Sequence, residues 1–161
     1  MAEVRLREWP VGPVRRRSSG RAALAERERA LARAPLFSSL PKRQQRAIAR
    51  VTGVWTYPQG SVIVQEGKPG ASFFVILEGR ASVMKGKRSI GRLSWGEFFG
   101  EISLLDPGPR TASVIADTDV TCLELAAKDF LDVIAAENAI AGSMLRVLAR
   151  RLREAERPLV G

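Results

Sequence analysis

From residue 54 to residue 125, hydrophobic side chains come in short runs that alternate with glycine- and proline-containing turns. The runs are rich in valine, isoleucine and phenylalanine, which favour β-strands. Short strands with a turn about every eight to twelve residues are typical of a sandwich or a jelly-roll-like barrel. The predicted strands are Val54–Tyr57, Ser61–Gln65, Ser72–Leu77, Ala81–Lys85, Ser89–Leu93, Thr111–Ala116 and Val120–Leu125, with an interruption at 97–110.

Helical patterns flank this region on both sides. Residues 21–33 combine Ala, Leu, Glu and Arg, which are strong helix formers, and a second predicted helix begins at Pro41 and ends near Gly53. After the strands, helices are predicted at 127–136 and 139–156, with a break near Asn138. The last helix carries apolar residues at helical spacing, with arginines on the other face. These apolar residues are Ile140, Met144, Leu145, Leu148 and Leu152.

Charge is concentrated at the two ends of the chain. The 161 residues carry a formal charge of +9, but residues 1–34 hold nine of the arginines with four acids, and residues 143–161 hold five with two. The stretch between them is almost neutral, so nucleic acid is not the expected partner. Residues 1–20 are predicted to form a flexible arm because they combine Pro, Gly and an Arg-Ser cluster.

Composition also excludes several kinds of chemistry. The chain has no histidine, so it has no Ser-His-Asp or Cys-His catalytic group and no histidine metal ligand. Its single cysteine, Cys122, cannot form an internal disulfide and lies in a strand pattern typical of a buried residue. No apolar run approaches the roughly 18–20 residues of a membrane span, and no secretion signal follows the arginine cluster. We therefore expect a cytoplasmic protein that is not an enzyme and needs no metal or other cofactor.

The interruption at 97–110 carries the candidate chemistry. A strand ends at Gly100, a short helical turn follows, and a Pro/Gly-rich loop leads to Arg110 at the start of the next strand. Glycine permits close approach of a ligand, and the free amides that begin a helix attract an anion. Arg110 can offer paired donors to phosphate oxygens, whereas Glu101 suits a ribose hydroxyl. Phosphate and ribose together indicate a nucleotide, and the absence of a Gly-rich loop ending in Gly-Lys argues against a triphosphate.

This segment resembles the phosphate-binding cassette of cyclic nucleotide-binding domains. The matching residues are Phe99-Gly100-Glu101-Ile102-Ser103-Leu104 and Pro109-Arg110-Thr111-Ala112, and the resemblance extends over residues 35–157. It implies an α+β, mainly β fold: an eight-stranded β-roll with an N-terminal helix, a short cassette helix and two C-terminal helices. On this basis residues 1–34 are a basic arm with a helix at 21–33, residues 35–157 are the nucleotide-binding domain, and residues 158–161 are a tail.

The resemblance also implies the roles of individual residues. The cassette residues Gly100, Glu101, Ile102, Ser103, Arg110, Thr111 and Ala112 would bind the cyclic phosphate and ribose of cAMP or cGMP. In the family, a threonine at the position of Thr111 occurs both in domains that bind the guanine nucleotide and in domains that bind the adenine nucleotide. It therefore does not distinguish cGMP from cAMP, of which cAMP is favoured. Val83, Leu148 and Arg150 are the candidates for the base pocket; Arg146 and Arg151 are not distinguished from them by the sequence.

The predicted function is a cyclic nucleotide sensor. Ligand binding would move the terminal helices, hinged near Asn138 and Gly142, and so signal to an effector protein; the same helices could form a homodimer. Two alternatives stay open. The β-roll could be a ligand-independent interaction or scaffold protein, with Glu101 and Arg110 as an ion pair that only stabilises the fold. The chain could also be a fragment of a catabolite-activator-type transcription regulator without its helix-turn-helix.

Overall fold

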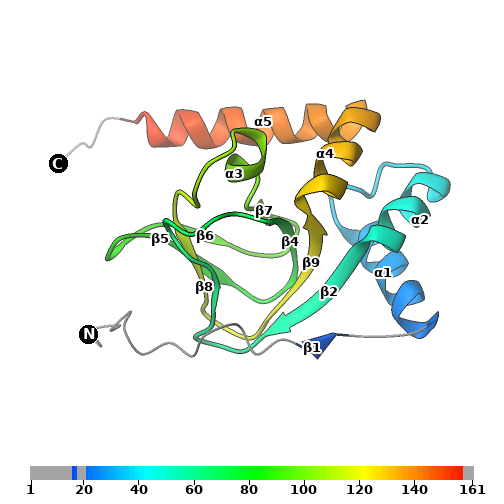
Figure 1. The fold of residues 1–161 in the computed structure, drawn as a ribbon, viewed down its shortest axis with the longest axis horizontal. Helices are drawn as coiled ribbons and strands as arrows, with labels where there is room; N and C mark the ends of the chain where they lie inside the picture. Colours follow the sequence, from blue (N-terminus) through cyan, green and yellow to red (C-terminus); the bar gives the residue numbers. More distant parts are fainter. Residues whose placement is uncertain (1–15, 18–20, 158–161) are drawn as a thin grey trace.

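The computed structural model describes residues 16–17 and 21–157, and Figure 1 shows their arrangement. The helices are α1 (Arg21–Arg33), α2 (Lys42–Val51), α3 (Ile102–Leu105), α4 (Ala127–Ala136) and α5 (Asn138–Ala155). The strands are β1 (Arg16–Arg17), β2 (Thr52–Tyr57), β3 (Val62–Val64), β4 (Ser72–Glu78), β5 (Ala81–Lys85), β6 (Arg88–Leu93), β7 (Phe98–Phe99), β8 (Ser113–Ala116) and β9 (Val120–Ala126).

The strands form two antiparallel sheets. One has the order β1-β2-β9-β4-β7 and the other the order β3-β8-β5-β6. Strands β2 to β9 make the predicted eight-stranded roll, and the fold class expected from the sequence is confirmed. The two-residue strand β1 lies at the edge of the first sheet, where Arg16 pairs with Thr56 and Arg17 with Trp55.

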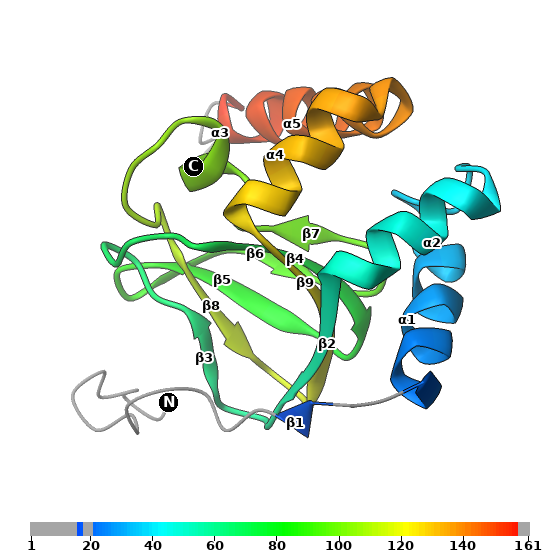
Figure 2. The ribbon, with the colours of Figure 1, turned by 45° about the vertical axis from the view of Figure 1, so that its right-hand side comes forward.

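Alternation along β4 explains how the core is divided. Phe73 and Val75 belong to a hydrophobic cluster that includes residues of all five helices, whereas Phe74 and Ile76 belong to a second cluster drawn from both sheets. Successive side chains of a strand point to opposite faces, so one face of β4 packs against helices and the other fills the roll. Figure 2 shows α4 and α5 crossing one side of the sheets and α1 and α2 packed at one end.

Most predicted elements are present with small shifts in their bounds. The helix predicted at 21–33 is α1, and α5 begins at Asn138, one residue earlier than predicted, because the extended residue is Glu137. Strand β8 begins at Ser113 and not at Thr111. The four phenylalanines of β4 and β7 are buried, and so is Cys122, whose thiol pKa is raised by burial.

Parts of the predicted organisation lie outside the described residues. These are arm residues 1–15 and 18–20 and the tail at 158–161. Helix α1 packs through Ala23 and Leu31, both buried, so this part of the predicted arm contacts the domain. Within the described residues, no helix combines the length and the apolar character needed to cross a bilayer.

Candidate ligand-binding site

The cassette residues lie between β7 and β8, where the chain turns sharply at Gly100. Its φ of +92° lies in the left-handed region, and an added Cβ would be 2.8 Å from both the Arg110 Nη1 atom and the Ser72 carbonyl oxygen. Only glycine fits both the backbone conformation and this close contact. Gly100 therefore lets the backbone approach the buried arginine, whereas the sequence predicts close approach of a ligand.

The Arg110 side chain is held by three hydrogen bonds to neutral oxygen atoms. Nη1 donates to the Gly100 carbonyl at 2.9 Å and to the Ser103 hydroxyl at 3.0 Å, and Nη2 donates to the Ser72 carbonyl at 2.7 Å. The residue is 7% exposed, and burial lowers the pKa of its guanidinium, opposed by Glu101 and Glu124. Arginine stays protonated nevertheless, so a positive charge is fixed at this point.

A cavity of about 250 Å³ opens beside this charge. Its wall includes Arg110, Ser72, Phe74, Lys68 and the backbone of the loop that precedes β4. That loop is tied to the cassette, because the Gly67 amide donates to the Arg110 carbonyl and the Arg110 amide donates to the Lys68 carbonyl, both at 2.8 Å. The arrangement places a buried guanidinium in the wall of a small cavity whose lining is otherwise largely apolar, and a guanidinium there can pair with an anion.

Glu101 is 2% exposed and lies at the start of α3. Burial raises the pKa of its carboxyl; a hydrogen bond from its own amide and the nearby charges of Arg151 and Arg110 act in the opposite direction. Its hydrogen-bond partner on another element is Arg151, at 3.1 Å, and the bonds of Arg110 all go to neutral oxygens. The ion pair considered for Glu101 and Arg110 is thus replaced by a pair that connects the cassette to α5.

Arg151 joins the C-terminal helix to the cassette by three contacts. Besides the bond to Glu101, Nη2 donates to the Phe98 carbonyl at 2.7 Å, and the guanidinium carbon lies 4.6 Å from the centre of the Phe98 ring. The sequence left Arg151 undistinguished among the arginines of this helix. Helical spacing could have distinguished Arg151 from the other arginines of α5, because it lies seven residues after the buried Met144 and therefore on the same side of the helix.

The other predicted residues lie at different depths around the cassette. Ser103 is buried, whereas Ile102 and Thr111 are exposed and Ala112 is half-buried. Of the base-pocket candidates, Val83 packs against the cluster inside the roll, Leu148 packs against the helical cluster, and Arg150 is exposed on α5. Sequence reasoning missed Ser72, because its contribution is a backbone carbonyl, which no side-chain pattern reveals.

Comparisons with known proteins identify the family of this chain. A family model described as "Cyclic nucleotide-binding domain" matches residues 54–137. The chain is 37% identical over 103 residues to a cAMP-dependent protein kinase regulatory subunit of Hypocrea atroviridis, covering 64% of this chain and 22% of that protein. It is also 37% identical over 105 residues to the cyclic AMP receptor protein of Thermus thermophilus, covering 62% and 49%.

Among solved structures, a cyclic nucleotide-binding domain from Methylobacillus flagellatus has the same fold, with a TM-score of 0.71, 23% identity and coverage of 87% of this chain and 84% of that one. The chain spans about a fifth of the fungal protein and about half of the bacterial receptor. The curated relatives are, by their names, regulatory or receptor proteins. With a family match over more than half of its length and a cassette of this geometry, the chain belongs to the cyclic nucleotide-binding domain family.

Proposed function

We propose that the chain is a cAMP-binding sensor module in which Arg110 and the cassette hold the cyclic phosphate. The observation that carries this proposal is a buried guanidinium, bonded only to neutral oxygens, in the wall of a cavity of about 250 Å³. Burying a charge is costly unless an opposite charge compensates it. An incoming phosphate supplies that charge. Its oxygens can accept two parallel N–H bonds from one arginine, and the amides of Ile102 and Ser103 at the start of α3 can add to them.

Glu101 is proposed to bind the ribose 2′-hydroxyl, which donates to the carboxylate. The same carboxylate already accepts from Arg151, so ribose and α5 meet at one side chain. A ligand changes a conformational equilibrium when it binds one of the two states more tightly. In this mechanism the bound ribose alters the position of Arg151 and therefore of α5. The extended backbone at Glu137, between α4 and α5, is the proposed hinge; Gly142 lies within the continuous α5.

Val83, Leu148 and Arg150 remain the proposed base pocket, with Arg151 now added because it contacts the cassette. cAMP is proposed over cGMP because both curated relatives described above are named for cAMP. The output is proposed to be regulatory and not enzymatic: a cytoplasmic module that signals to an effector protein. The exposed apolar face of α5 is proposed to form a homodimer.

Calorimetric titration of the full chain with cAMP and with cGMP tests this function, with 5′-AMP as the control that lacks the cyclic phosphate. We expect cAMP to bind most tightly. Loss of one partner of a buried charge pair costs about 2–5 kcal/mol, so Arg110→Ala should weaken cAMP binding by roughly thirtyfold or more. Arg46→Ala, at an exposed arginine of α2 that lies outside the proposed nucleotide site, is the matched control. No binding of either cyclic nucleotide, or an Arg110→Ala variant with full affinity, would refute the assignment and favour a ligand-independent interaction protein.

A further inference from the structure

Helix α2 carries a row of exposed cations that the nucleotide site does not use. Its sequence has four basic residues and no acidic residue, and all four basic side chains are exposed. They are Lys42, Arg43, Arg46 and Arg50. At about 100° per residue these four positions fall within an arc of about 100°, on the side of the helix away from the buried Ile48. We call this set the α2 row.

The α2 row has no neutralising partner within the part of the chain that the structure describes. None of its four side chains takes part in an ion pair there; the ion pair among the described residues is the one between Arg151 and Glu101. Exposed cations of helices are often balanced by acids three or four positions away. Helix α2 lacks such acids, so its charges are available to an anionic partner.

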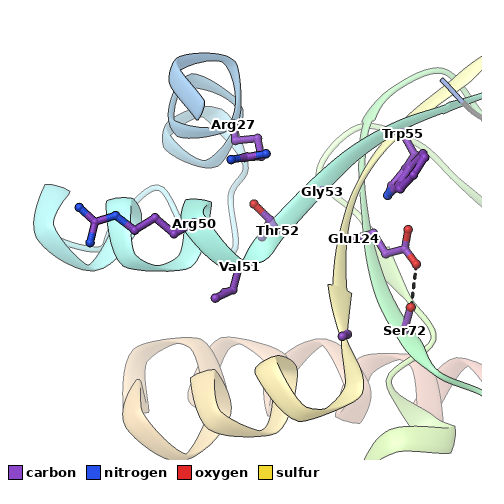
Figure 3. Close-up of a pocket in the computed structure, with 9 residues that line it drawn as sticks. Arg27, Arg50, Val51, Thr52, Gly53, Trp55, Ser72 and Glu124 are labelled. Atoms are coloured by element: carbon purple, nitrogen blue, oxygen red, sulfur yellow. Dashed lines mark hydrogen bonds between the residues drawn. The ribbon is translucent and has the colours of Figure 1, made fainter. Parts of the chain in front are cut away.

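A second, independent feature adjoins the C-terminal end of the row. A cavity of about 300 Å³ lies between α1, α2 and β2, and its wall includes Arg27, Arg50, Val51 and Trp55 (Figure 3). Arg27 lines this cavity, and its buried Nε atom has no hydrogen-bond partner among the described residues. A cationic side chain in the wall, with one donor unsatisfied, favours an incoming carboxylate that can compensate its charge. The far wall holds Glu124, which accepts a hydrogen bond from the Ser72 hydroxyl at 2.7 Å. Its negative charge opposes that of an incoming acid, so the cavity disfavours a polyanion and any acidic side chain must be held by Arg27 and Arg50.

We propose that the α2 row and this cavity form a docking surface for an acidic segment of a protein partner. From Lys42 to Arg50 the row extends about 12 Å, the length of two turns of a facing helix with acids at every third or fourth position. A protein that makes about 6–10 phosphate contacts on a nucleic acid needs more cations than the four of this row. Membrane-surface helices place a wide apolar face beside their cations, whereas the apolar side chain exposed next to the row is Val51. A second copy of this chain, at +9, is not complementary to the row as a whole.

Fluorescence anisotropy with a labelled, Glu-rich helical peptide tests the surface on the full chain. The double variant Arg46→Glu/Arg50→Glu should weaken peptide binding by at least about tenfold. Lys85→Glu/Lys87→Glu, which changes the same charge at the exposed turn between β5 and β6, is the matched control and should weaken it by about threefold or less. Arg27→Gln should also weaken binding of the peptide, because it removes a cation from the cavity. Since it leaves the α2 row intact, it tests the cavity separately.

A DNA duplex and vesicles containing phosphatidylserine, titrated at the same salt concentration, distinguish the other anionic partners. Unchanged melting temperature and cAMP affinity of each variant show that it is folded. The proposal is overturned if wild-type protein does not bind the peptide, or if both double variants lose affinity equally, since net charge alone would then explain binding. It is also overturned if DNA or vesicles bind more tightly than the peptide and that binding is lost in Arg46→Glu/Arg50→Glu.

Discussion

The guanidinium of Arg110 is buried against three neutral oxygens, and each of them comes from a different segment of the chain: Ser72 at the start of β4, Gly100 after β7, and Ser103 in α3. The backbone of Gly70 also passes close to this side chain, because an added Cβ there would lie 3.0 Å from the Arg110 Cζ atom. Buried side chains with perturbed pKa values are often functional. Here a buried charge whose hydrogen bonds all go to neutral oxygens lies at the point where the ligand phosphate is proposed to bind.

Glu101 gives a prediction at the same scale. Burial raises the pKa of its carboxyl above the ordinary 4.5, so the folded state binds a proton at pH values where the unfolded state has lost it. The free energy of unfolding decreases as the pH rises wherever the folded state binds more protons than the unfolded state. We therefore expect the free energy of unfolding of wild-type protein, relative to Glu101→Gln, to fall as pH rises from 4.5 through the raised pKa.

Urea unfolding of the two proteins over a series of pH values measures this difference. Glutamine has a similar shape and no titrating proton, so the comparison isolates the carboxyl of Glu101. A relative free energy that instead rises with pH would mean that Arg151 and Arg110 stabilise the carboxylate more than burial destabilises it. The raised pKa would then be wrong.

At the scale of elements, the sequence predicts the strands well where turns separate them and poorly around the cassette. Strand β5 has its predicted bounds because Gly79 and Gly86 punctuate it. Thr111 and Ala112 are predicted to begin a strand, but the bonds of the preceding Arg110 to the loop before β4 hold them outside β8. Position along one chain does not reveal such tertiary constraints.

The contact between α5 and the cassette is also tertiary, because Arg151 and Glu101 are 50 residues apart in the chain. Two neighbouring arginines of α5 allow it to be tested: Arg151 contacts Glu101 and Phe98, whereas Arg150 is exposed. A hydrogen bond to a charged group contributes about 1.5–3 kcal/mol when buried, and the Arg151 side chain is 31% exposed, so we expect about 1 kcal/mol.

This corresponds to roughly fivefold faster amide hydrogen exchange in the last turns of α5 for Arg151→Ala. Exchange measured by mass spectrometry should show no such change for Arg150→Ala. Equal protection of α5 in the two variants would show that the contact with Glu101 does not hold the helix, and the proposed link between ribose and α5 would lose its basis.

At the scale of the whole molecule, residues 35–142 are nearly neutral in total, but their basic and acidic side chains lie on different surfaces. The four cations of α2 lie at one end, and Lys85, Lys87 and Arg88 gather at the turn between β5 and β6 at the other (Figure 1). Acidic residues lie on other elements, such as Asp129 and Asp132 of α4. A charge total along the sequence therefore underestimates how basic individual surfaces are, because folding groups residues that the sequence averages.

The exposed apolar face of α5 is the proposed homodimer interface. Leu145 and Leu152 are 66% and 60% exposed and lie seven residues apart, with Leu148 between them. This is the a/d spacing of a coiled coil, in which two helices bury such a stripe against each other.

We expect a dimer whose sedimentation coefficient falls to that of a monomer in Leu145→Glu/Leu152→Glu. The matched control, Ile90→Glu/Leu131→Glu, adds the same charge at exposed apolar positions of β6 and α4 and should remain dimeric. Because α5 also carries Arg151, the monomeric variant should bind cAMP with altered affinity; a wild-type chain that sediments as a monomer at all accessible concentrations would leave the stripe to another partner and exclude the homodimer.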